Sequence, residues 1–80
     1  MLRVSVISPE ALLFEGDAQS VVAPAHDGEV GILTGHAPML TLIGTGTLRL
    51  GGGPSFTVKG GFMQVVDDHV RVVTEQAAKA

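Results

Sequence analysis

The side chains of this 80-residue chain that could do metal or acid–base chemistry are three histidines and a few carboxylates. His26, His36 and His69 fall in three separate predicted loops. None of them has the i, i+4 or His-x-His spacing that places two metal ligands together. We therefore interpret His26 and His69 as polar turn residues, and we predict no metal site.

Carboxylates stand close together in the sequence at two places, Asp67 with Asp68 and Asp27 with Glu29. In an extended segment Asp27 and Glu29 point to the same face, which in principle suits acid–base catalysis. Catalysis also needs a pocket and perturbed pKa values, and a small domain filled by Val, Leu and Ile offers no obvious pocket. No Gly-x-Ser-x-Gly nucleophile motif occurs. We predict that the chain is not an enzyme and binds no cofactor.

Composition limits the class of protein further. A chain of 80 residues makes one small domain, which buries only about 60% of the surface its unfolded form exposes. Charged residues make up 16% of the chain, below the usual share of roughly a quarter, and this shortage indicates that part of the surface is covered in the working state. The five basic residues are scattered and the net charge is −3, so no basic cluster exists to bind nucleic acid.

The absence of cysteine excludes disulfides and thiolate metal sites, and it fits a reducing compartment. Residues 1–6 alternate between apolar and polar types, unlike the continuous apolar core of a signal peptide. No stretch approaches the ~20 apolar residues of a membrane span. We expect a soluble, cytoplasmic chain.

The elements that must position these residues are strands. Apolar and polar residues alternate with a period of two along most of the chain, and Gly, Pro and Asp interrupt the pattern at short intervals. The predicted strands cover residues 2–6, 12–15, 19–23, 29–33, 39–43, 47–50, 55–59, 62–66 and 70–73. The pattern predicts an all-β fold, an antiparallel sandwich or barrel. Gly51-Gly52-Gly53-Pro54 is a hairpin turn, because it lacks the Lys-Ser/Thr of a phosphate loop.

Only residues 74–80 favour a helix, and this segment is too short to form a stable helix unaided. We therefore assign residues 1–74 to the β domain. Residues 75–80 are predicted to be a helical stub or a disordered tail.

The stretch from Gly28 to Thr41 is the most informative part of the sequence. Gly28-Glu29-Val30-Gly31-Ile32 joins a turn to a strand, and Gly35-His36-Ala37-Pro38 makes a corner, since Pro38 removes a backbone donor and holds Ala37 extended. In this order and at this separation, the two motifs resemble those of the epsilon subunit of the F-type ATP synthase. Other segments that resemble the family are Ser8–Glu10, Phe14–Gly16, Gly46, Arg49, Gly60–Val65 and Val70–Val72.

The resemblance covers nearly all 80 residues, but only the amino-terminal β domain of the usual subunit and not its carboxy-terminal helical hairpin. It implies a small flattened antiparallel β-sandwich of about 8–10 short strands. It also implies a non-catalytic rotor (central stalk) subunit of a proton- or sodium-translocating F-type ATP synthase. Such a subunit bridges the gamma subunit and the c ring, and helps couple ion flow to ATP synthesis. It is membrane-associated only through the complex, at the cytoplasmic face of the bacterial inner membrane.

The resemblance implies two sets of contact residues. The family's ring-facing loop, which meets the polar loops of the c ring, corresponds here to His26, Asp27, Gly28 and Glu29. Glu29 matches the characteristic acidic residue of that loop, and its charge complements a basic residue of the c subunit. The face toward gamma corresponds to Ser8, His36 and Thr41, to which Met39 and Leu40 add apolar contact.

The alternative function is a free-standing ligand-binding or protein-interaction module. A ligand-binding module needs an apolar cleft or an aromatic platform, and the only aromatic residues here are three phenylalanines.

In many family members the helical hairpin inhibits ATP hydrolysis, and in some it binds ATP. We expect this 80-residue polypeptide to do neither.

Overall fold

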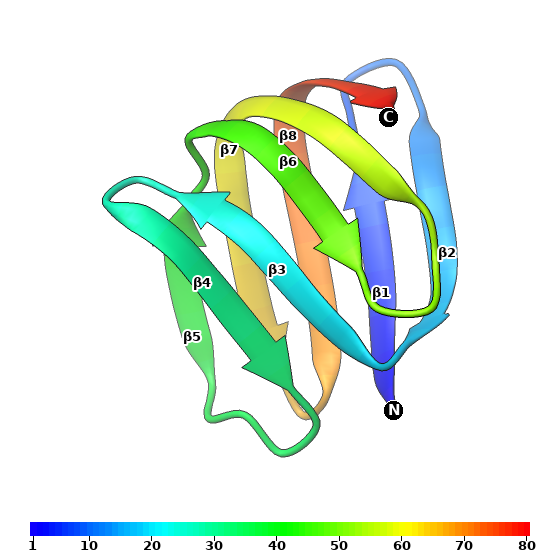
Figure 1. The fold of residues 1–80 in the computed structure, drawn as a ribbon, viewed down its shortest axis with the longest axis vertical. Helices are drawn as coiled ribbons and strands as arrows, with labels where there is room; N and C mark the ends of the chain where they lie inside the picture. Colours follow the sequence, from blue (N-terminus) through cyan, green and yellow to red (C-terminus); the bar gives the residue numbers. More distant parts are fainter.

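The computed structural model describes residues 1–80, which form eight β-strands and no helix (Figure 1). The strands are β1 (Leu2–Ile7), β2 (Leu12–Ala18), β3 (Ser20–Ala25), β4 (Gly28–Leu33), β5 (Met39–Leu42), β6 (Thr45–Leu50), β7 (Ser55–Val66) and β8 (His69–Lys79). The prediction of a small all-β sandwich is therefore confirmed. No helix is present that could cross a membrane.

One hydrogen-bonded sheet folds over on itself to make the two layers of the sandwich. Its strand order is β2-β1-β8-β7-β6-β3-β4, and β5 pairs with β7 as well. Residues 55–59 of β7 pair with β6, whereas residues 62–65 pair with β5. The two long strands therefore belong to both layers, and the sequence-predicted strands 55–59 and 62–66 are one continuous strand.

We call the two layers A and B. Layer A contains β2, β1, the first half of β8, the second half of β7, and β5. Layer B contains the second half of β8, the first half of β7, β6, β3 and β4. In Figure 1 the strands β3, β4 and β6 of layer B lie in front, and β1, β5 and β8 lie behind them. One pairing is parallel, that of β1 with β8, and it places the first and last strands of the chain side by side.

The strand pair β7–β8 bends from one layer to the other at two glycines. Gly60 and Gly61 have φ values of 72° and 110°, a region that suits glycine. A Cβ atom at Gly61 would overlap the carbonyl oxygen of Val73. The register of the pair is the same on both sides of the bend, with Lys59 opposite Gln76 and Gly61 opposite Thr74. The glycines therefore allow a fold in the sheet without breaking its ladder.

The core lies between the layers and consists of aliphatic side chains from alternate strand positions. In β1 the residues Leu2, Val4 and Val6 are fully buried, as their period of two predicted. The rest of the buried apolar cluster is Ala18, Val21, Ala23, Ile32, Ile43, Leu48, Leu50, Phe56, Val58, Met63, Val65, Val70 and Val72. Burial of one such large side chain contributes about 1.5–3 kcal/mol, so these residues supply most of the drive to fold.

The predicted helical or disordered tail over residues 75–80 is wrong. Strand β8 continues to Lys79, and Ala80 N donates a hydrogen bond to Ser55 O at 2.8 Å. Ala77 packs against the core. The alanine-rich segment favours a helix only in isolation, and the free edge of β7 gives its backbone a ladder of partners that a one-turn helix lacks.

Candidate functional site

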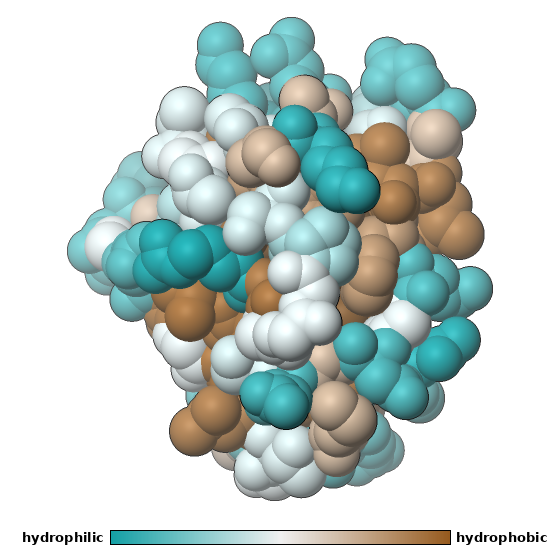
Figure 2. Space-filling view, turned by 45° about the vertical axis from the view of Figure 1, so that its right-hand side comes forward, coloured by the Kyte–Doolittle hydropathy of each residue, from teal (hydrophilic) through white to brown (hydrophobic).

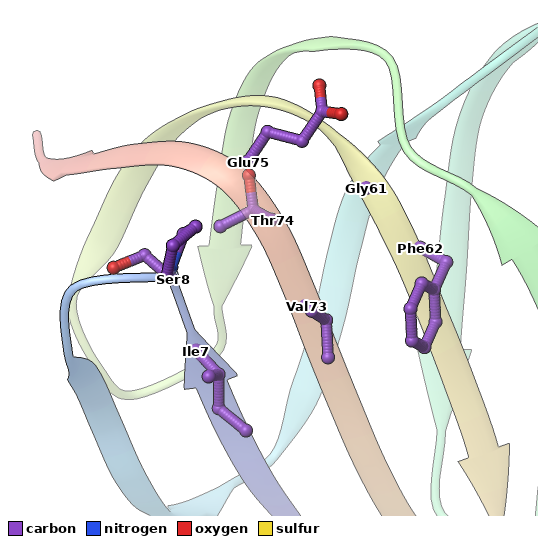
Figure 3. Close-up of a pocket in the computed structure, with 8 residues that line it drawn as sticks. Ile7, Ser8, Gly61, Phe62, Val73, Thr74 and Glu75 are labelled. Atoms are coloured by element: carbon purple, nitrogen blue, oxygen red, sulfur yellow. The ribbon is translucent and has the colours of Figure 1, made fainter.

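A row of apolar side chains crosses the outer face of layer A. Its members face one another from strand to strand, in the order Leu12, Ile7, Val73, Phe62 and Leu42. Figure 3 shows Ile7, Val73 and Phe62 side by side on β1, β8 and β7. The two end residues, Leu12 and Leu42, are 56% and 64% exposed, and Phe62, next to Leu42, is 36% exposed. We call these five residues the apolar row.

The sequence produces this row because several strands carry two apolar residues in succession. In Val6-Ile7, Val72-Val73 and Met63-Phe62, the first residue of each pair is buried in the core and the second faces outward. At these three pairs of residues, layer A is therefore apolar both on the side that faces the core and on its outer face. Contiguous exposed apolar surface on a small domain marks an interaction site.

Two hollows lie along the row, and Phe62 lines both. The larger, of about 410 Å³, opens where β8 bends away from β1, and its lining includes Ile7, Ser8 and Glu75 (Figure 3). The smaller, of about 330 Å³, is lined by Leu40, Thr41, Leu42 and Phe62. The row therefore offers concave surface on both sides of one aromatic ring, a shape that accepts apolar side chains of a partner.

The predicted gamma-facing residues are divided between the interior and this surface. Ser8 is buried, and its hydroxyl donates to Ala11 O at 3.3 Å. Met39 packs against the core, Thr41 is half-buried, and only Leu40, at 70% exposure, presents a large apolar side chain to solvent. Ser8 and Thr41 nevertheless line the two hollows beside Phe62.

The corner that carries His36 is held by the β7–β8 turn. Asp68 Oδ1 accepts a hydrogen bond from Gly35 N at 2.7 Å, and His36 Nδ1 lies 2.7 Å from Ala37 O. The side chain of Asp68 therefore caps a loop 33 residues away in sequence, rather than the backbone of its own turn. This contact ties the end of layer A to the loop between β4 and β5.

The sequence prediction missed the members of the apolar row, namely Ile7, Leu12, Leu42, Phe62 and Val73. The sequence did contain an indication of this surface. A strand with apolar residues on both of its faces is usually covered on both faces. Met39 to Ile43 is such a run, with Thr41 as its only polar member. The cross-strand register that brings the five residues into one row is not visible in the sequence.

The predicted ring-facing residues are together at the turn between β3 and β4. His26, Asp27, Gly28 and Glu29 are all exposed, and Gly28 has a φ of 134° that favours glycine. Arg49 Nη2 donates to Glu29 Oε1 at 3.3 Å. His26 N donates to Leu42 O at 3.1 Å, so the turn adjoins one end of the apolar row.

The outer face of layer B differs from that of layer A. Its exposed residues include Thr45, Thr47, Thr57, Lys59 and Gln76. Figure 2, which looks obliquely onto this face, shows mostly white and teal residues, with brown ones in separate patches. The structure contains no group of three or more His, Asp or Glu side chains that could hold a metal ion.

Comparison with known families places this geometry in context. A family model described as the beta-sandwich domain of the ATP synthase delta/epsilon chain matches residues 1–80. The chain belongs to this family. The resemblance indicated by the Gly-Glu-Val-Gly-Ile and Gly-His-Ala-Pro motifs is therefore confirmed.

Curated relatives of this delta/epsilon domain are named ATP synthase epsilon chain. That of Leptospira borgpetersenii is 41% identical over 80 residues, which are 96% of this chain and 63% of the relative. That of Solibacter usitatus is 43% identical over 82 residues, with 99% of this chain and 61% of the relative covered. The chain thus spans less than two thirds of the length of these relatives.

Solved structures share the fold of the delta/epsilon domain. A chain in the Euglena gracilis mitochondrial ATP synthase structure of OSCP, F1 and c-ring has a TM-score of 0.89 and 21% identity, covering 98% of this chain and 52% of that one. A chain in the central stalk and c-ring structure of the Tetrahymena thermophila mitochondrial enzyme has a TM-score of 0.84 and 15% identity, covering 96% and 65%. At these identities the likeness shows the fold alone.

Proposed function

We propose that this domain is a non-catalytic part of the rotor, or central stalk, of an F-type ATP synthase. In this proposal it binds the gamma subunit through the apolar row, binds the polar loops of the c ring through the β3–β4 turn, and helps couple ion flow to ATP synthesis. The family membership and the relatives' shared name support the complex. The domain would be held at the cytoplasmic face of a bacterial inner membrane through these partners.

The observation that carries the proposal is the apolar row. A small domain gains stability by burying large apolar side chains, yet Leu42 and Leu12 are more than half exposed. Complete burial of such a side chain is worth about 1.5–3 kcal/mol, and covering its exposed part gains the corresponding share before the costs of association. The row includes an aromatic residue that lines both hollows, and polar residues border it, the usual composition of a protein contact. This arrangement fits a lasting contact with another subunit.

The β3–β4 turn suits a weaker, polar contact. Its residues are exposed and carry two carboxylates, Asp27 and Glu29. Exposed charges of this kind contribute roughly 0.2–1 kcal/mol each. The turn therefore fits a polar contact with the c ring, in which charge complementarity selects the partner, while the apolar row provides the affinity for gamma.

The proposal is tested at Phe62, which lines both hollows, with the variant Phe62→Lys and with Thr57→Lys as a matched control. Both positions are exposed and lie on β7, but Thr57 belongs to the polar face of layer B. We expect Phe62→Lys to weaken binding to isolated gamma at least 30-fold, the effect of losing about 2 kcal/mol from an interface anchor. Thr57→Lys should stay within about twofold of the unsubstituted chain.

Titration calorimetry measures both affinities, after circular dichroism has shown that each variant is folded. Equal affinity of the two variants for gamma would contradict the proposal. The gamma contact would then lie elsewhere on the domain, whereas failure of the unsubstituted chain to bind gamma would favour the free-standing interaction module.

A further inference from the structure

Glu29, the acidic residue of the β3–β4 turn, is paired within the domain. Arg49 on β6 donates to its Oε1 at 3.3 Å. The two strands are not neighbours, because β3 lies between β4 and β6. The guanidinium therefore reaches across β3, where Val22 pairs with Gly31 on one side and Arg49 on the other. The space around Gly31 is open, so no side chain at that position blocks the route.

The pair leaves half of the carboxylate available. One hydrogen bond joins the two side chains, and they are 51% and 57% exposed. A carboxylate has two oxygens and about four lone-pair sites, so Glu29 can accept from a second cation through Oε2 while Oε1 keeps its contact with Arg49. Arg49 also restricts the rotamers of the Glu29 side chain before binding, so less conformational entropy is lost when the partner binds.

We propose that Arg49 is a positioning residue for the contact with the c ring. It holds the Glu29 carboxylate at the surface of layer B, so that Oε2 meets a lysine or arginine of the partner and the carboxylate bridges two cations. This inference rests on the proposed function of the turn and adds a residue that does not itself touch the partner's cation.

Loss of the Arg49 charge is expected to change the affinity for the c ring in opposite directions, depending on whether Arg49 positions Glu29 or only adds to the net charge. Removal of the positive charge of Arg49 makes the turn more acidic, which by complementarity alone should strengthen binding of a basic partner. If Arg49 positions Glu29, the same removal weakens binding, because the carboxylate is no longer held in place. The direction of the change therefore separates the two explanations.

The experiment measures binding of the complex of this chain with gamma to purified c ring in detergent at low ionic strength, by biolayer interferometry. The variants are Glu29→Gln, Arg49→Gln, the double variant, and Arg49→Lys. Lys59→Gln is the matched control, because it removes a positive charge from the same outer face without an ion-pair partner. Thermal unfolding of each variant checks that the fold is retained.

We expect Glu29→Gln and Arg49→Gln each to weaken binding about twofold to fivefold, the range for exposed charge pairs. The double variant should be no weaker than Glu29→Gln alone, since Arg49 acts only through Glu29. Arg49→Lys should restore part of the loss, and Lys59→Gln should bind at least as well as the unsubstituted chain.

Two results would overturn the inference, and they differ from each other. If Glu29→Gln weakens binding while Arg49→Gln binds as well or more tightly, the turn contacts the ring but Arg49 does not position it. If Glu29→Gln has no effect, the proposed ring contact of the turn is itself wrong, and the role of Arg49 falls with it.

Discussion

Two neighbouring side chains of β5 face in opposite directions. A substitution at one therefore tests folding, and a substitution at the other tests binding. Met39 lies opposite the buried Val65 and packs against the core, whereas Leu40 lies opposite Gln64 and is 70% exposed. A charged group placed at Met39 is partly buried against the apolar core, but at Leu40 it reaches water. Effects on folding and on binding can therefore be separated within one strand.

We predict that Met39→Asp lowers the free energy of unfolding by about 1–3 kcal/mol, through lost packing and a partly desolvated carboxylate. Leu40→Asp should change it by less than about 0.5 kcal/mol and weaken binding to gamma instead. Urea unfolding followed by circular dichroism measures the first quantity, and calorimetry with gamma the second. Similar destabilisation by both substitutions would show that the outward position of Leu40 is wrong.

At the scale of the elements, the fold depends on the bend that lets β7 and β8 serve both layers. The bend is possible because Gly61 has a φ of 110° and no Cβ to meet the carbonyl oxygen of Val73. It also shapes the larger hollow, which opens where β8 leaves β1 and is lined by Gly61 and Phe62. One backbone feature thus supports both the sandwich and its candidate interface.

Gly61→Ala should destabilise the domain by at least about 3 kcal/mol, from backbone strain and from overlap with the facing strand. Gly31→Ala is the control, because open space surrounds that position and its φ is not positive. The control should change stability by no more than about 1 kcal/mol, in the stabilising direction if at all. Thermal unfolding compares the two, and a Gly61→Ala domain as stable as the control would contradict the account of the bend.

At the scale of the whole molecule, the two surfaces adjoin rather than lie at opposite ends. The hydrogen bond from His26 N to Leu42 O joins the β3–β4 turn to the apolar row. One surface is apolar and the other charged, so salt should affect them differently. Screening acts over about 10 Å at 0.1 M salt and weakens contacts between exposed charges, while apolar burial does not depend on such screening.

We expect an increase from about 0.05 M to 0.5 M salt to weaken binding to the c ring several-fold and to leave binding to gamma within about twofold. The two affinities are measured separately on the same preparation. A parallel fall in both would show that the gamma contact is also electrostatic, against the role of the apolar row.

The sequence by itself determined which way most strand side chains face, where the main turns fall, and the family. The period of two in Leu2, Val4 and Val6 fixed which face of a strand is buried, because side chains alternate across a strand whatever lies beside it. The Gly-His-Ala-Pro corner and the glycine turns fixed where the chain changes direction. The acidic turn from His26 to Glu29 was also visible, since its residues are contiguous.

The tertiary structure alone decided which residues lie side by side. The segment 75–80 became a strand because β7 offered it hydrogen bonds, and Arg49 met Glu29 because β3 brings β6 and β4 together. The apolar row needs the register of five strands from both ends of the chain. Alternation tells which way a side chain points, whereas its cross-strand neighbour depends on the pairing of distant strands, and that is a property of the whole fold.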